Sequence, residues 1–92
     1  MEKMLKDRVA IITGSGRGIG KATAIMFAAE GAKVVVSDID AEPAEETVAE
    51  IRATGGEAVT FAGDVTAPDF AQGIVKKASD TWGALHIIVN NA

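Results

Sequence analysis

The sequence predicts an α/β fold: half of a Rossmann doubly wound parallel sheet, in a three-layer α/β/α arrangement, truncated after its fourth strand. Four short apolar runs, of the kind found in strands buried on both faces, alternate with three segments of helical periodicity. A glycine-rich turn joins the first run to the first helical segment. Strands separated by helices need crossover connections, which are right-handed in nearly all cases. We therefore expect a βαβαβαβ order and parallel strands arranged 3-2-1-4.

The first two strands are predicted at residues 9–12 and 33–37, and the second of these contains three consecutive valines. Between them the pattern becomes helical from Ile19, and Gly31 supplies a C-terminal stop. This helix has an apolar stripe, as core-facing helices do, made of Ile19, Ala22, Met26 and Ala29.

The second helix has clear start and stop signals. Asp40 can cap it, Pro43 suits its first turn, and the pair Gly55-Gly56 ends it. Four glutamates lie on the face opposite the apolar one, which we interpret as solvated. The apolar face carries Ala41, Ala44, Val48 and Ile51.

The third and fourth strands are predicted at residues 57–62 and 85–90. Between them, Thr66 with Asp69 three residues later resembles a capping box with Asp in place of the usual Glu. The third helix therefore follows Thr66, and Gly83 ends it. The side expected to pack on the sheet carries Phe70, Ile74, Ala78 and Trp82.

Composition excludes several classes of protein. With no cysteine and one histidine among 92 residues, the chain has neither a disulfide framework nor the ligands of a zinc site, so we expect no metal. Thirteen acids against nine bases argue against a nucleic-acid partner. The sequence shows no signal-peptide pattern and no apolar run of membrane-spanning length, so no membrane partner is expected. We expect a cytoplasmic chain whose residues 1–92 form a single, partial NAD-binding domain.

The turn at residues 13–20 reads Thr-Gly-Ser-Gly-Arg-Gly-Ile-Gly and lies where a dinucleotide fingerprint belongs. Its glycines allow a tight turn and a close backbone approach to a pyrophosphate, while the following helix offers unpaired N–H groups and the positive end of its dipole. A purely structural turn is the alternative. A strand before, a helix after and an acid about 20 residues on favour cofactor binding. The candidate cofactor-binding residues here are Gly14, Ser15, Arg17, Gly18, Ile19 and Gly20.

Asp38 is the expected acid, at the end of the second strand and eighteen residues beyond Gly20. Its carboxylate can accept hydrogen bonds from both hydroxyls of an adenosine ribose. It would repel a 2′-phosphate by about 4 kcal/mol at a separation of about 4 Å and an effective dielectric near 20. Asp38, with the neighbouring Ile39, therefore favours NAD as the cofactor. Arg17 keeps an NADP interpretation open as the less favoured one, and a solvated loop acid is the alternative for Asp38.

The glycine-rich turn and Asp38 resemble the N-terminal, cofactor-binding half of the short-chain dehydrogenase/reductase family. Many members are 3-oxoacyl-(acyl-carrier-protein) reductases or small alcohol dehydrogenases more than twice as long as this chain. The resemblance runs along the whole sequence. The family's first motif, T-G-x-x-x-G-x-G, is matched by Thr13, Gly14, Gly18 and Gly20.

Two further family motifs occur in order. The adenine-contacting acid after the third strand is similar to Asp64, which Val65 follows. The N-N-A-G segment is matched by Asn90, Asn91 and Ala92, with its glycine beyond the end of the sequence. The resemblance implies that Asp64, Val65, Asn90 and Ala92 belong to the cofactor site.

The sequence departs from the family in two places. His86 stands where the family usually has an Asp before the fourth strand. Since ligands of open α/β sheets bind at the carboxyl ends of strands, we expect a structural role for His86 at the other end. The family's catalytic Tyr, Lys and Ser lie in its second half, and this sequence contains no tyrosine. The resemblance therefore implies that the chain has no catalytic residue and is inactive alone.

The resemblance implies an oxidoreductase acting on CH–OH groups. This chain would be the cofactor-binding part of an enzyme that transfers hydride between NAD(H) and a small carbonyl or secondary-alcohol substrate. The alternative is a non-catalytic nucleotide-binding or assembly module. The predicted edge strand lacks the charges, prolines and bulges that usually protect such edges. We therefore expect a homo-oligomer, or association with the polypeptide that completes the fold.

Overall fold

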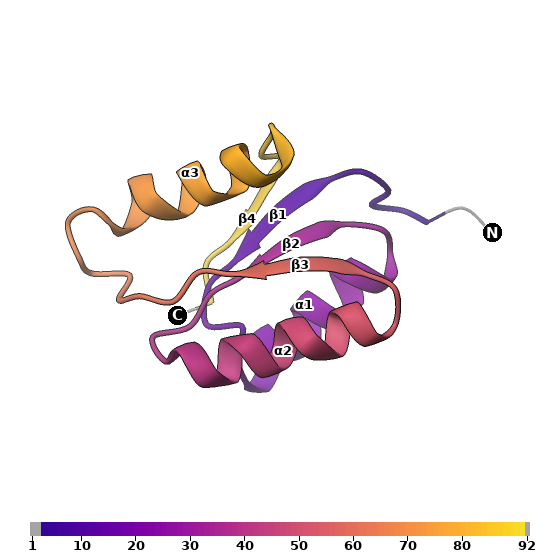
Figure 1. Ribbon diagram of the computed structural model, residues 1–92, viewed down its shortest axis with the longest axis horizontal. Coiled ribbons are helices and arrows are strands. Elements are labelled where there is room, and N and C mark those ends of the chain that lie inside the picture. The colour runs from indigo at the N-terminus through magenta and orange to yellow at the C-terminus, as the bar shows by residue number, and fades with distance from the viewer. Residues whose placement is uncertain (1–2, 92) are drawn as a thin grey trace.

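The computed structural model describes residues 3–91 and contains one four-stranded parallel sheet with the order β3-β2-β1-β4 (Figure 1), as the sequence predicts. In register, Ile11 of β1 lies between Val35 of β2 and Ile88 of β4. The elements follow one another as β1 (Val9–Ile12), α1 (Gly18–Ala29), β2 (Lys33–Val36), α2 (Ala41–Ala53), β3 (Glu57–Thr60), α3 (Phe70–Trp82) and β4 (Ile87–Val89).

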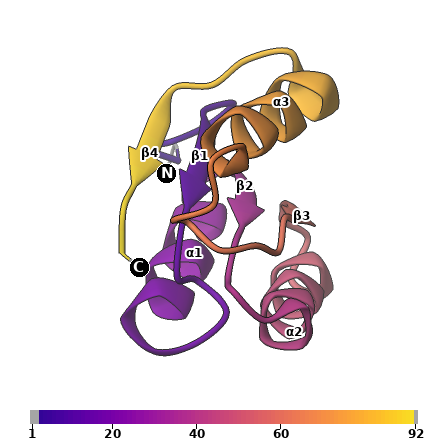
Figure 2. The same ribbon diagram turned by 90° about the vertical axis from the view of Figure 1, so that its left-hand side faces the viewer.

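Helices α1 and α2 cover one face of the sheet and α3 covers the other, which gives three layers (Figure 2). Successive strand residues point to opposite faces, so Val34 and Val36 pack under α1 and α2 while Val35 packs under α3. The strands β1 and β2 are buried on both faces, which explains their continuous apolar runs. Of the described residues, none belongs to a helix with the length and apolar character needed to span a bilayer.

Helix α1 turns a different face to the sheet from the one predicted. The expected stripe is exposed: Ile19 retains 79% of its accessible surface and Met26 62%, and Ala22 and Ala29 are also exposed. The apolar residues of α1 occur on several sides, so periodicity alone selected the wrong side. Small side chains decide the packing because they let the helix approach the strands and the preceding turn closely. The buried residues of α1 are Gly20, Ala24 and Ala28.

Helix α2 begins after Asp40, as predicted, but the Asp40 carboxylate makes no capping hydrogen bond. It pairs with Arg17 instead. Ala41 is exposed, whereas Thr47, which the apolar pattern left out, is fully buried. The Thr47 hydroxyl makes hydrogen bonds of 3.2 Å to the Gly16 carbonyl and 3.1 Å to the Pro43 carbonyl, and these tie α2 to the turn after β1.

The predicted capping box before α3 is wrong. The helix begins at Phe70, and Asp69, the residue before it, makes no side-chain capping bond. Thr66 instead donates its N–H and its hydroxyl to Oδ1 of Asp64, at 2.8 and 2.7 Å, because an Asp side chain readily accepts from the backbone two residues on. The C-terminal end is as predicted, with Gly83 in the left-handed region at φ 74°.

The edge strand β4 is held to β1 at its start by His86. The Val9 N–H donates to Nδ1 of His86 at 2.9 Å, and the His86 N–H donates to the Val9 carbonyl at 2.9 Å. These bonds give His86 the structural role expected of it. Farther along, Ile88 remains 53% exposed, so β4 is the least covered strand of the sheet.

Candidate functional site

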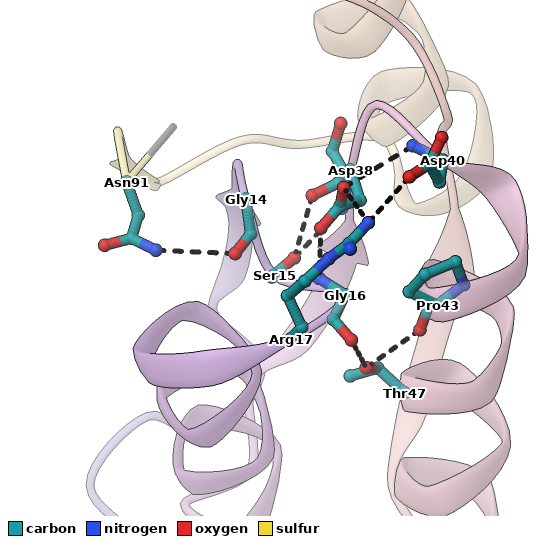
Figure 3. A network of polar contacts seen from close by, with 10 residues as sticks. Gly14, Ser15, Gly16, Arg17, Asp38, Asp40, Pro43, Thr47 and Asn91 are labelled. Atoms are coloured by element: carbon teal, nitrogen blue, oxygen red, sulfur yellow. Dashed lines mark hydrogen bonds and ion pairs between the residues drawn. The ribbon is translucent and has the colours of Figure 1, made fainter.

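The carboxyl ends of three strands meet around a hollow of about 530 Å³. Its wall consists of Gly14 and Arg17 after β1, residues 37–40 after β2 and residues 63–65 after β3. In an open α/β sheet this is the edge at which ligands bind. Figure 3 shows the turn after β1 facing Asp38 and Asp40 across this edge.

The turn after β1 depends on glycine at specific positions. Gly14 and Gly18 both have φ 62°, a left-handed conformation that costs other residues energy. A Cβ atom on Gly18 would meet nothing within 4 Å, so the backbone there is open to a ligand. A Cβ atom on Gly20 would overlap the Gly14 carbonyl oxygen and lie 2.6 Å from Nδ2 of Asn91. The glycines thus serve both internal packing and access to the backbone.

The N-terminus of α1 is suited to an anion. Arg17 occupies the N-cap position without a side-chain capping bond, and the first turn of the helix contains no acid. The first N–H groups of a helix lack partners within the helix and form the positive end of its dipole. The Gly18 and Ile19 backbone therefore offers donors beside the hollow, and the exposed Ile19 side chain points away from the core.

Ser15 lies in the turn as predicted, but its polar atoms face the protein interior. Its hydroxyl donates to the Ile12 carbonyl at 2.6 Å and accepts from the Ser37 N–H at 3.0 Å. The Ser15 N–H is also engaged, by the Ser37 carbonyl at 2.8 Å. Ser15 therefore joins the ends of β1 and β2 and shapes the turn, whereas the sequence predicts that it contacts the cofactor. The reason is that Ser15 lies between the ends of β1 and β2, where the backbone groups of Ile12 and Ser37 bind its hydroxyl.

Asp38 is 7% exposed, and its carboxylate is ordered by three donors. Oδ2 accepts from the Gly16 N–H at 3.0 Å, and Oδ1 accepts from Arg17 at 3.3 Å and from the Asp40 N–H at 3.4 Å. Burial opposes ionisation, but the N–H groups of Asp40 and Gly16 and the Arg17 guanidinium outweigh it and hold the pKa of Asp38 below its usual value. Asp38 is therefore a fixed anion at neutral pH.

Arg17 lies between two carboxylates, as Figure 3 shows. Its Nη2 is 2.8 Å from Oδ2 of Asp40 and 3.3 Å from Oδ1 of Asp38. Hydrogen bonds to Asp40 and Asp38 raise the pKa of Arg17 above its ordinary value. The guanidinium therefore stays charged, and both of its partners are acids of this chain.

The segment after β3 completes the wall with Asp64 and Val65. The hydrogen bonds from the Thr66 side chain and backbone lower the pKa of Asp64, which is exposed. Val65 keeps 45% of its surface exposed and Ile39, on the segment after β2, keeps 64%. These two exposed apolar side chains line the same hollow and offer apolar surface that an aromatic ring could contact.

The structure brings Asn91 rather than Asn90 to the turn. The Asn91 N–H donates to Oγ1 of Thr13 at 3.0 Å, and its side-chain amide donates to the Gly14 carbonyl at 3.4 Å. Asn90 is exposed at the end of β4, and Ala92 lies outside the described residues. Thr13 and Asn91 are therefore further residues of the turn beyond the predicted site residues, and both stand in the family motifs.

Gly16 is a further residue that the candidate set lacks. Its N–H binds Asp38, and a Cβ atom there would lie 2.7 Å from Oδ2 of Asp38 and 2.9 Å from Cβ of Pro43. Its signal in the sequence was available, since it is a glycine inside the fingerprint. The motif T-G-x-x-x-G-x-G, however, leaves position 16 open to any residue.

A larger hollow, of about 860 Å³, lies at the opposite edge of the sheet. It is bordered by Lys3, Lys6 and the loops at Gly31 and Gly55. Those loops precede β2 and β3, so this hollow is at the amino ends of the strands, away from the glycine-rich turn. Within residues 3–91, no three His, Asp or Glu side chains converge as a metal site requires.

Comparison with known proteins agrees with the fold and the turn. Residues 8–92 match the family model described as short chain dehydrogenase. An uncharacterized oxidoreductase of Thermotoga maritima is 54% identical over 87 residues, which are 95% of this chain and 34% of that protein. Cyclohexanol dehydrogenase of an Acinetobacter species is 45% identical over 92 residues, covering 100% of this chain and 37% of that protein.

Solved structures show the same relationship. A hydroxysteroid dehydrogenase from Escherichia coli matches with a TM-score of 0.93 and 45% identity, over 96% of this chain and 37% of that one. The chain spans about a third of the length of the curated relatives it matches. Because the family model covers nearly the whole chain and the fold agrees, the chain belongs to the short-chain dehydrogenase family.

Proposed function

We propose that this chain forms the NAD-binding part of an enzyme that transfers hydride between NAD(H) and a carbonyl or secondary alcohol. One observation carries the proposal: a buried, ionised Asp38 stands beside a glycine-rich turn at the N-terminus of α1, on one hollow. The turn offers donors for a pyrophosphate, and Asp38 offers acceptors for ribose hydroxyls.

The residues of the hollow fit a dinucleotide. Gly14 in the wall of the hollow and the open Gly18 beside it would let the pyrophosphate approach the backbone, while Gly20 packs α1 against the turn. The exposed Ile39 and Val65 would contact the adenine, with Asp64 beside it. Ser37 adds a second sign of fit: its hydroxyl is buried in the wall and has no hydrogen-bond partner among the described residues. When bound, the nicotinamide ring would donate hydride to a carbonyl or accept it from an alcohol, and this chain positions and orients the cofactor.

Asp38 supports NAD in preference to NADP. A 2′-phosphate placed near Asp38 would meet a like charge, with a repulsion of about 4 kcal/mol at about 4 Å and an effective dielectric near 20. Arg17, the one cation in the wall of the hollow as described, already faces two carboxylates. The charge around the ribose position is therefore net negative.

The proposed substrate class rests on relatives. One relative is a cyclohexanol dehydrogenase and one structural neighbour a hydroxysteroid dehydrogenase, so a secondary alcohol is the favoured substrate class. The catalytic groups would come from polypeptide outside these 92 residues, because the family's tyrosine is not among them. We also propose a cytoplasmic enzyme that assembles with copies of itself.

Calorimetric titration with NAD and NADP tests the cofactor proposal. We expect wild type to bind NAD more tightly, and Asp38→Ala combined with Ile39→Arg to shift the ratio of the two affinities toward NADP. Asp80→Asn on the exposed side of α3 is the matched control, since it removes one acid far from the hollow and should leave the ratio unchanged. Tighter binding of NADP by wild type would contradict the proposal.

A further inference from the structure

Asp40 occupies a position where its carboxylate would normally cap a helix. An Asp at the N-cap of a helix usually accepts a hydrogen bond from the backbone N–H two or three residues on. At the start of α2 this bond is not made. Oδ2 of Asp40 lies instead 2.8 Å from Nη2 of Arg17, a residue 23 positions away, and both side chains are mostly exposed.

Oδ1 of Asp38 has both of its acceptor positions occupied while Arg17 is bound to it, whereas Oδ2 accepts one donor. Two of the three donors to Asp38 are backbone N–H groups, those of Gly16 and Asp40. The third, Arg17, is a long side chain with 60% exposure. A ribose hydroxyl that donates to Oδ1 of Asp38 would therefore compete with Arg17, the only side-chain donor of the three.

We propose that Asp40 is a positioning residue for cofactor selectivity, which keeps Arg17 from binding a 2′-phosphate when a ribose occupies Asp38. This inference rests on the proposed function. Arg17 has two acidic partners, and the contact with Asp40 is the shorter one. When a ribose hydroxyl takes over Asp38, Asp40 still holds the guanidinium. Without Asp40, Arg17 is a free cation beside the ribose position and can pair with a phosphate there.

The expected effect is modest because the pair is exposed. Exposed ion pairs rarely change an equilibrium by more than about fivefold. We expect Asp40→Ser to raise the affinity for a 2′-phosphorylated ligand, relative to the same ligand without that phosphate, by about fivefold. Serine removes the charge and keeps a side chain able to cap α2.

The test measures calorimetric affinities of this chain for ADP-ribose and for ADP-ribose carrying a 2′-phosphate. Four proteins form a double-mutant cycle: wild type, Asp40→Ser, Arg17→Ala and the double variant. Asp80→Asn is the control, because it breaks a comparably exposed 2.7 Å ion pair on α3. We expect the affinity ratio to change about fivefold on Asp40→Ser, to stay as in wild type for the control, and to show no such change when Arg17 is already alanine.

Each outcome bears on a different claim. A gain of equal size with and without Arg17 would mean that removal of negative charge alone explains it, and would overturn the role of Asp40 through Arg17. Tight binding of ADP-ribose with no change in the ratio for Asp40→Ser, or for Asp40→Asn as a second variant, would overturn this inference and leave the cofactor proposal standing. Failure of wild type to bind either ligand would overturn both. The dispersion of the backbone amide resonances, recorded for each variant, establishes that the variant is folded.

Discussion

Replacing Gly20 by alanine tests the packing of the glycine-rich turn against α1. Helix propensity alone predicts that Gly20→Ala stabilises, by about 1 kcal/mol. The structure predicts the opposite, because the new Cβ would overlap the Gly14 carbonyl oxygen and lie 2.6 Å from Nδ2 of Asn91. A backbone carbonyl cannot rotate away as a side chain does, so α1 must shift from the turn. Overpacking typically costs up to about 3 kcal/mol, and the higher helix propensity of alanine returns about 1 kcal/mol. We therefore expect the free energy of unfolding to fall by about 2 kcal/mol.

Thermal unfolding followed by circular dichroism measures this loss. For a domain of this size, about 2 kcal/mol lowers Tm by roughly 8–16 °C. Gly18→Ala is the matched control in the same turn: its Cβ meets nothing within 4 Å, so only the left-handed φ of 62° is penalised, at about 1 kcal/mol. A Gly20→Ala protein as stable as wild type, or more stable than the Gly18→Ala protein, would refute the packing argument.

Four other perturbations have expected outcomes. Ser15→Ala should lower the free energy of unfolding by about 1–3 kcal/mol in urea titrations, since it leaves buried backbone groups with fewer partners, while Ser79→Ala on the exposed side of α3 should not. Gly14→Val should abolish NAD binding in calorimetry, because φ is 62° there and the added side chain stands at the pyrophosphate position. The pKa of Asp38 is lowered in the folded state, so its contribution to stability is complete above the unfolded value of about 3.9 and is lost as the pH falls below it. Unfolding of Asp38→Asn should therefore depend less on pH than unfolding of wild type below about pH 4. Light scattering of the 92-residue polypeptide should give a mass above 9.4 kDa, and Ile88→Lys on the edge strand should reduce it; a stable 9.4 kDa monomer in wild type would count against association through β4.

The strand order was predictable because it depends on features that are local in the sequence. Continuous apolar runs identify strands buried on both faces, and the helices between them force parallel crossovers. The glycines of the turn and the acid after β2 are also local signals at a characteristic spacing. The sheet, its layers and the position of Asp38 follow from these patterns alone.

Choices between nearly equivalent local arrangements were not predictable. Helix α1 has apolar residues on several sides, and close packing at Gly20 selected the side with the smallest residues. Thr66 binds the carboxylate of Asp64, two residues before it in the sequence, and does not cap α3. The Arg17–Asp40 pair joins residues 23 positions apart, so only the folded chain shows that Asp40 binds Arg17 and leaves α2 uncapped.

The proposed function requires the nucleotide to bind in the hollow at the carboxyl ends of the strands. Titration of the isotope-labelled chain with NAD, followed by its backbone amide resonances, tests this claim directly. We expect the largest shifts in residues 14–20, which include the Gly14 and Arg17 wall of the hollow, and in residues 38–40 and 63–65, which complete that wall. Shifts centred on Lys6, Gly31 and Gly55 at the opposite edge, or no shifts at saturating NAD, would contradict it.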